Sequence, residues 1–188
     1  MDIQNITDKL PKHATKVFTQ RPLAQISHIA VHHSTGDPHK VTVEGIARYH
    51  VDSNGWAGIG YHYCITVDGS IYQVNDLEAI AAHVYGHNGT TVGVCLIGDF
   101  TKDEPPDAQR RALAWLLAHL HGMLGIPLEN VKGHRDFPGQ DTSCPGDSWI
   151  EWGMTVLDEA HTLVSDAPRL WSESEIRALI AQGAKGGQ

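Results

Sequence analysis

The chain has 188 residues, a length typical of one domain that buries its own core. Its 14 Lys and Arg residues and 22 Asp and Glu residues give a formal net charge of -8, which argues against a general nucleic-acid binder with a basic surface. No apolar run reaches the roughly 20 residues of a membrane span, and the N-terminus MDIQNITDKL lacks the pattern of a secretory signal, so we expect cytoplasmic synthesis and neither nucleic acid nor membrane as a partner.

The first half of the chain predicts alternating strands and helices. Residues 1–24 are weakly patterned and indicate an irregular N-terminal arm with at most one helical turn. The stretch SHIAVHHS (27–34) predicts a strand, because apolar residues alternate in it and the run ends in polar residues. VTVEGIARYHVDSNG (41–55) predicts a helix that Thr42 caps, and GYHYCITVDGSIYQV (60–74) predicts a hairpin around an Asp-Gly turn.

The second half adds one strand and two long helices. TVGVCLIGDF (91–100) is a continuous apolar run, as expected of a buried central strand. PPDAQRRALAWLLAHLHGMLG (105–125) predicts a helix with Asp107 as its cap and Gly125 at its end. SWIEWGMTVLDEAHTLV (148–164) predicts a second amphipathic helix.

Together these elements predict an α/β fold, a single domain with a central mixed β-sheet flanked by helices. We divide the chain into the N-terminal arm at 1–24, the domain that carries the candidate site at 25–165, and a C-terminal helical tail at 166–188. In the tail, Ser172 and Glu175 have the spacing of a capping box, which predicts a helix start.

The three cysteines fall into two kinds. Cys64 and Cys95 sit in apolar runs, which predicts buried free thiols, and the sequence leaves a disulfide between them open. Cys144 differs because Ser, Pro and Gly residues surround it, so it belongs to a loop.

Two histidines have settings that suit metal binding together with Cys144. His32 ends an apolar strand, and His134 follows a glycine at what we expect to be another strand end. Zinc takes nitrogen and sulfur ligands, and a catalytic zinc site has three protein ligands and leaves one position for water. The two imidazoles and the thiolate therefore indicate a zinc site, although by spacing alone two unrelated loops are the alternative.

Four stretches follow one another along the chain: VHHST, GYHYCI, AAHVYGHNGTTVGVCLIGDF and GHRDFPGQDTSCPG. In this order they resemble the zinc-dependent N-acetylmuramoyl-L-alanine amidases of type 2, a superfamily that includes the peptidoglycan recognition proteins and the small phage lysozyme-type amidases. The resemblance covers roughly residues 25–157 and rests on all four motifs, because each alone is weak. It implies Zn2+ as cofactor, peptidoglycan as partner, and cleavage of the amide bond between N-acetylmuramic acid and the L-alanine of the stem peptide.

The resemblance also implies roles for single residues. His32, His134 and Cys144 would be the zinc ligands. Tyr61 matches the catalytic tyrosine, which helps to position the attacking water. Thr142 stands where the family places a lysine or a threonine beside the scissile carbonyl. A neutral hydroxyl donates a hydrogen bond to the developing oxyanion but supplies no charge.

Three further residues are expected to touch substrate. His83 and Asn88 lie in the loop before the central strand, which in the family borders the muramyl-peptide groove, and Trp56 lies just before the predicted catalytic tyrosine. Arg135 and Asp136 are expected to form a buried ion pair that braces the loop after the ligand histidine. The remaining histidines that we considered are expected to be structural or surface residues: His33, His62, His87, His119 and His121.

We therefore predict a monomeric zinc amidase of peptidoglycan. A phage-type endolysin is the first interpretation, made in the cytoplasm and acting on the cell wall after release, and a cytoplasmic muropeptide-recycling amidase is the alternative. A non-catalytic recognition module is a second alternative, against which Cys144 argues because such relatives typically lack the cysteine ligand. A Cys-His hydrolase that uses the Cys144 thiolate as nucleophile is the third.

Overall fold

The computed structural model describes residues 1–166, so the predicted tail helix with Ser172 and Glu175 lies outside the described residues. The predicted α/β domain with a mixed sheet and flanking helices is confirmed. The strands are β1 (Ile3–Asn5), β2 (His28–His33), β3 (Tyr63–Ile65), β4 (Ile71–Gln73), β5 (Thr91–Leu96) and β6 (Val131–Gly133).

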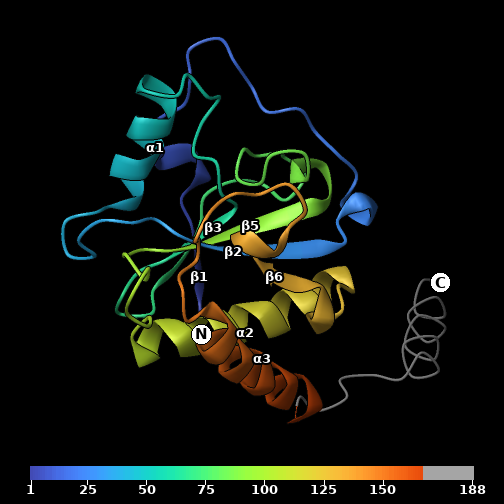
Figure 1. Ribbon diagram of the computed structural model, residues 1–188. Coiled ribbons are helices and arrows are strands. Elements are labelled where there is room, and N and C mark those ends of the chain that lie inside the picture. Colours follow the sequence, from blue (N-terminus) through green and yellow to red (C-terminus); the bar gives the residue numbers. More distant parts are fainter. Residues whose placement is uncertain (167–188) are drawn as a thin grey trace, which may run out of the picture.

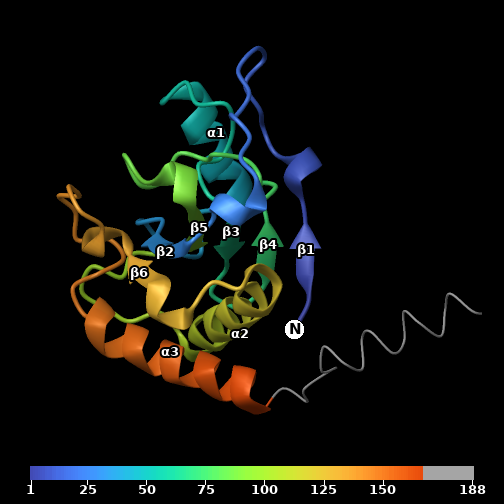
Figure 2. The same cartoon turned by 90° about the vertical axis from the view of Figure 1, so that its right-hand side faces the viewer.

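All six strands form one sheet in the order β1-β4-β3-β5-β2-β6 (Figure 2). The predicted hairpin is present, because β3 and β4 pair antiparallel, and the other neighbours in the sheet are parallel. Every residue of β5 is buried, as its continuous apolar run predicts for an inner strand. Since β5, β2 and β6 are parallel neighbours, their carboxyl ends meet at the same edge of the sheet, the usual place for a ligand site.

The N-terminal arm is more ordered than its sequence predicts. Ile3–Asn5 form β1, which pairs in parallel with β4 at one edge of the sheet. Further along the arm, Arg21 is buried and its guanidinium donates hydrogen bonds to the carbonyl oxygens of Leu77 and Asn88. A strand of three residues is too short to show a period, so the pattern could not reveal it.

Helices cover both faces of the sheet (Figure 1). α2 (Asp107–Leu124) and α3 (Trp149–Asp166) pack on one face and share the larger hydrophobic core with it, whereas α1 (Val43–Asp52) covers the other. None of the described helices has the length and apolar character needed to cross a membrane.

The helix ends follow the predictions with one exception. The Thr42 hydroxyl accepts the Gly45 N–H and so caps α1, and Gly125 ends α2 in the left-handed conformation. Asp107 is not the cap of α2, because Pro106 occupies that position and the Asp107 carboxylate pairs with Arg110 instead.

Strand alternation separates the two faces of the sheet. Val94 and Leu96 of β5 belong to the core with α2 and α3, whereas Cys95 between them belongs to the core under α1. Cys64 is the direct neighbour of Cys95 across β3 and β5, and both are buried free cysteines, as predicted. His32 is the neighbour of Cys95 on the other side, so its side chain starts on the α1 face.

Candidate metal centre

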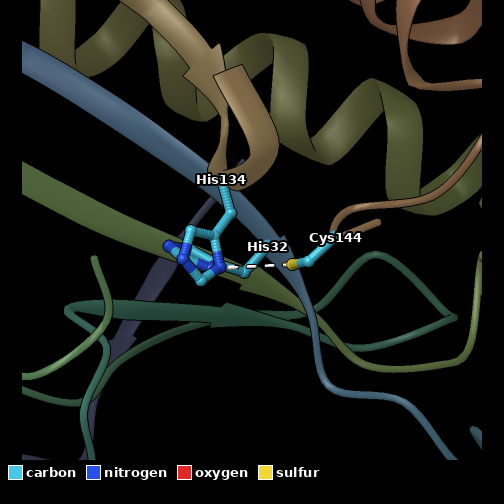
Figure 3. A group of neighbouring side chains, drawn as sticks. All are labelled: His32, His134 and Cys144. Carbon is cyan, nitrogen blue, oxygen red and sulfur yellow. Dashed lines mark hydrogen bonds between the residues drawn. The ribbon is translucent and has the colours of Figure 1, made fainter. Parts of the chain in front are cut away.

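The three predicted metal ligands lie together although the chain separates them widely. One donor atom each from His32, His134 and Cys144 lies within 4.8 Å of the others (Figure 3). The Nδ1 atom of His32 is 3.7 Å from the Sγ atom of Cys144, and the centroids of the two imidazole rings are 4.6 Å apart. The end of the strand that carries His32 and the loop from His134 to Cys144 therefore form one site.

The register of the sheet explains why the histidines meet. β2 and β6 are parallel, and Val31 is paired with Gly133. His32 is the next residue of β2, and His134 is the residue that directly follows the end of β6. The parallel register brings the end of β6 beside β2, so the chain leaves the sheet next to His32 and His134 begins the following turn there.

The loop from His134 to Cys144 folds back onto its own start. The backbone N–H of Arg135 donates to the carbonyl oxygen of Cys144 over 2.9 Å, which closes the loop. The Thr142 hydroxyl accepts the N–H of Cys144 over 3.1 Å. These bonds hold the thiol beside the histidines without a disulfide or other crosslink.

The predicted ion pair between Arg135 and Asp136 does not form. The Asp136 carboxylate accepts hydrogen bonds from the N–H of Gly133 and from the indole N–H of Trp149, the latter over 2.7 Å. Arg135 instead donates to the carbonyl oxygen of Gly146. Asp136 therefore braces the loop against Trp149, the first residue of α3, and Arg135 braces it against Gly146, just before that helix.

Burial sets the protonation states of the ligand candidates. It lowers the pKa of His32 well below its usual 6.5, with a further lowering from His134, and it lowers the pKa of His134 as well. Both imidazoles are therefore neutral at pH 7, and each can offer a nitrogen lone pair. Burial raises the pKa of the Cys144 thiol to about 12, so the sulfur needs a neighbouring cation to become a thiolate.

These protonation states separate the metal site from the Cys-His hydrolase. A nucleophilic cysteine has a lowered pKa and a basic partner, whereas the environment of Cys144 raises its pKa. Cys144 also lies five residues before the first residue of α3, Trp149, and not at the helix N-terminus. Two neutral imidazoles and one sulfur are the donor set that zinc prefers, so the residues fit that ion.

Tyr61 lies next to this cluster, with its ring centroid 5.2 Å from that of His32. It lines a cavity of about 480 Å³ between the chain that follows β2 and helix α1. Burial, and then the neighbouring Cys95, raise the pKa of Tyr61 well above its usual 10, so the phenol keeps its proton at neutral pH. The cavity has the size of a small-molecule site and adjoins the metal-ligand candidates through Tyr61.

Comparison with known proteins identifies the family of this chain. The family model described as N-acetylmuramoyl-L-alanine amidase (Amidase_2) matches residues 22–147. The chain belongs to this amidase family. The endolysin of Enterobacteria phage K11 is 32% identical over 151 residues, which cover 76% of this chain and 95% of the endolysin. The N-acetylmuramoyl-L-alanine amidase of Sus scrofa is 34% identical over 123 residues, which are 61% of this chain but only 20% of that longer protein.

Solved structures share the fold of this chain. An N-acetylmuramoyl-L-alanine amidase endolysin, LysCS from Clostridium intestinale, superposes with a TM-score of 0.67 at 26% identity, covering 82% of this chain and 95% of that one. The Ph2119 endolysin of a Thermus scotoductus bacteriophage superposes with a TM-score of 0.71 at 24% identity, covering 85% and 99%. The predicted amidase fold is therefore confirmed.

The predicted substrate residues of this amidase-family chain lie in three settings. Trp56 is half-buried and packs against the ring of His50, with 4.7 Å between their centroids. The Asn88 carboxamide oxygen accepts the backbone N–H groups of His83 and Val84. His83 is buried, and its ring lies against that of His32. Substrate contact by these residues stays a prediction.

One residue of the cavity was missed by the sequence analysis. His50 lines the cavity beside Tyr61, and its Nδ1 atom accepts the N–H of Gly60 over 3.0 Å. That bond leaves the proton on Nε2, so the neutral ring has a donor to offer. The signal was available, because Val43, Ala47 and His50 have helical spacing and form the buried side of α1.

The other histidines take structural positions. His33 is buried on the opposite side of β2 from His32, and its Nδ1 accepts the N–H of Phe100. His87 is half-buried and its Nε2–H donates to Pro138, so it joins two loops. On α2, His119 stacks on Trp115 and His121 bonds the carbonyl oxygen of Ile126.

Proposed function

We propose that the protein is a zinc-dependent peptidoglycan hydrolase that cleaves the amide bond between N-acetylmuramic acid and the L-alanine of the stem peptide. The observation that carries the proposal is the convergence of His32, His134 and Cys144 beside a cavity that Tyr61 lines, in a chain of the amidase family. Three protein ligands are the number that catalytic zinc sites have, so these residues would hold a zinc ion of the catalytic kind.

A zinc ion at this position would act as a Lewis acid that activates water and polarises the amide carbonyl. Hydrolysis adds water across the amide, breaks the C–N bond, and leaves a lactyl carboxylate and the free amino group of L-alanine. The chain's own residues hold the reacting groups. The Tyr61 phenol, which keeps its proton, donates a hydrogen bond to the water or the carbonyl oxygen.

Thr142 has a narrower role in this proposal. Its hydroxyl oxygen is engaged by the N–H of Cys144, which leaves the O–H free to donate toward the scissile carbonyl. A hydroxyl supplies no positive charge, in contrast to the lysine of some relatives. Stabilisation of the oxyanion therefore depends more on the metal, and we expect a lower turnover than with a lysine.

Digestion of purified peptidoglycan tests this function. The zinc-loaded protein, with and without a chelator, is incubated with the polymer, and the products are read by mass spectrometry. Free stem peptides that begin with L-alanine, and that disappear on chelation, are the expected result. Binding to peptidoglycan with every muramyl-peptide linkage intact, despite full zinc occupancy, would contradict it and favour the non-catalytic recognition module.

We also propose that the biological setting is that of a phage-type endolysin, made in the cytoplasm and acting on the wall after release. The match over 95% of the phage K11 endolysin supports this choice over a recycling enzyme. The proposal includes that the protein is a monomer and that it binds the muramyl peptides of the cell wall. Loss of turbidity of intact cell walls is expected, and activity confined to soluble muropeptides would indicate the recycling amidase instead.

A further inference from the structure

A second histidine, His83, is hydrogen-bonded to the ligand candidate His32 through the ring nitrogen that does not face Cys144. The Nε2 atom of His32 lies 3.1 Å from the Nδ1 atom of His83, and the two rings meet edge to face with 5.1 Å between their centroids. His32 is 1% exposed and His83 is 8% exposed, so water has little access to this bond. The other nitrogen of His32, Nδ1, is the one that faces Cys144.

The partners of His83 decide which nitrogen carries each proton. The hydroxyl of Thr91 donates to the carbonyl oxygen of His87 over 3.0 Å, so its lone pair is free to accept the Nε2–H of His83 across 3.4 Å. With its proton on Nε2, His83 presents a bare Nδ1 that accepts the Nε2–H of His32. The Nδ1 of His32 is then unprotonated, as a metal ligand requires.

The surrounding backbone is shaped to hold the His83 ring. A Cβ atom at position 93 would lie 2.7 Å from Cγ of His83, so the ring occupies space that only glycine leaves free on β5. The N–H of His83 is itself fixed by the Asn88 carboxamide, which also accepts the next N–H, that of Val84. Three separate features therefore place this ring: Gly93, Asn88 and the bond to Thr91.

We propose that His83 is a positioning residue that fixes the tautomer and orientation of His32 and thereby raises the affinity of the site for zinc. The inference rests on the proposed zinc site and adds a residue that acts through a ligand. Partners of this kind orient metal-binding histidines and make the ligand nitrogen more basic. This role differs from the predicted substrate contact, because both ring nitrogens of His83 are engaged by the protein.

Zinc affinity, measured by competition with a chelating dye and without peptidoglycan, tests the proposal. His83→Leu removes the acceptor, and we expect roughly 10- to 100-fold weaker zinc binding. His83→Asn places a carboxamide oxygen close to the position of Nδ1, and we expect it to restore the affinity to within a few-fold of the wild type. Wild-type affinity in His83→Leu, or an equal loss in both variants, would overturn the proposal.

A neighbouring histidine provides the matched control. His62 is fully buried beside His83, but it bonds Gly93 and Ala79 and none of the ligand candidates. His62→Leu is therefore expected to lower the free energy of unfolding while leaving the zinc affinity within a few-fold of the wild type. A loss as large as that of His83→Leu would show a general packing effect and overturn the proposal.

A second variant covers the case in which His83→Leu does not fold. Thr91→Val keeps the shape of the side chain but removes the acceptor that sets the tautomer of His83, and several-fold weaker zinc binding is expected. Unchanged affinity in Thr91→Val would then overturn the proposal. A wild type that binds no zinc contradicts the proposed function too, whereas zinc binding and cleavage unaffected by His83→Leu contradict this inference alone.

Discussion

The backbone N–H of His33 donates a hydrogen bond to the Sγ atom of Cys144 over 3.4 Å. β2 thus contributes to the candidate site twice, through the imidazole of His32 and through the main chain of the next residue. The bond favours the charged form of the sulfur, although burial outweighs it and keeps the pKa of the thiol at about 12 in the protein alone. The Cys144 sulfur is therefore fixed at the site as a thiol, and a neighbouring cation is needed to ionise it.

Removal of the thiol therefore tests the metal site directly. We expect Cys144→Ala to lose zinc and amidase activity together, because the remaining two imidazoles make an incomplete site. Zinc content by elemental analysis and release of stem peptides are measured on the same sample. Cys64→Ala is the matched control, since that cysteine is buried on β3 and is not one of the ligand candidates. Full activity in Cys144→Ala would refute the site.

Tyr61→Phe separates catalysis from metal binding. The variant loses only the phenol O–H, and we expect kcat to fall by about 100-fold, the effect of removing one donor to a developing oxyanion. Zinc affinity should be unchanged, because Tyr61 is not among the metal-ligand candidates. Stem-peptide release by the zinc-loaded variant gives kcat. Turnover equal to that of the wild type would remove Tyr61 from the proposed mechanism.

The other histidine ligand candidate, His134, is hydrogen-bonded to a residue that is more exposed than His83. The Nε2–H of His134 donates to the Gln140 carboxamide over 3.1 Å, and Gln140 in turn donates to the carbonyl oxygen of Tyr85. Gln140 is half-buried, so water can take its place in Gln140→Ala. We expect zinc binding to weaken by no more than a few-fold, less than in His83→Leu. A larger loss than in His83→Leu would contradict this ranking, which follows from burial.

The stability of the zinc-free protein should depend on pH through its buried histidines. Burial lowers the pKa of His50 and of His62 to about 4, whereas an ordinary histidine has a pKa of 6.5. Well above pH 6.5 these histidines are unprotonated in both the folded and the unfolded chain, and the full stability is present. Between pH 6.5 and 4 the unfolded chain takes up protons that the folded chain does not, so the free energy of unfolding falls as the pH falls.

Urea unfolding of the zinc-free protein at about pH 7.5 and about pH 5 measures this effect, for which we expect a loss on the order of 2 kcal/mol from each of the two histidines. The variant His62→Gln keeps a donor for the Ala79 carbonyl but cannot be protonated, and its loss between the two pH values should be smaller. An equal loss in His62→Gln and the wild type would rule out His62 as a source of the pH dependence.

The sequence was most informative where the signal is periodic or where motifs occur in order. The long helices, the hairpin and β5 have clear patterns, and the resemblance singled out three ligand candidates that the structure brings within 4.8 Å. Register cannot be read from a sequence, so the side-by-side placement of His32 and His134 rested on the family likeness. The pairing of Val31 with Gly133 supplies its physical cause.

The residues that escaped prediction depend on tertiary contacts. β1 is too short to show a period, and His50 looked like an ordinary residue at the end of a helix. The bond between His32 and His83 joins residues 51 positions apart and requires the space left by Gly93, which no local pattern announces. The pairing expected for Arg135 and Asp136 failed because neighbours in sequence were assumed to be partners in space.

The central claim is that one zinc ion is held by two imidazoles and one thiolate. X-ray absorption at the zinc edge of the loaded protein tests it most directly, because sulfur and nitrogen scatter at different distances. The account predicts one sulfur at about 2.3 Å and two histidine nitrogens at about 2.0–2.1 Å, with the sulfur absent in Cys144→Ala. A wild-type zinc shell of nitrogen and oxygen alone would contradict the account.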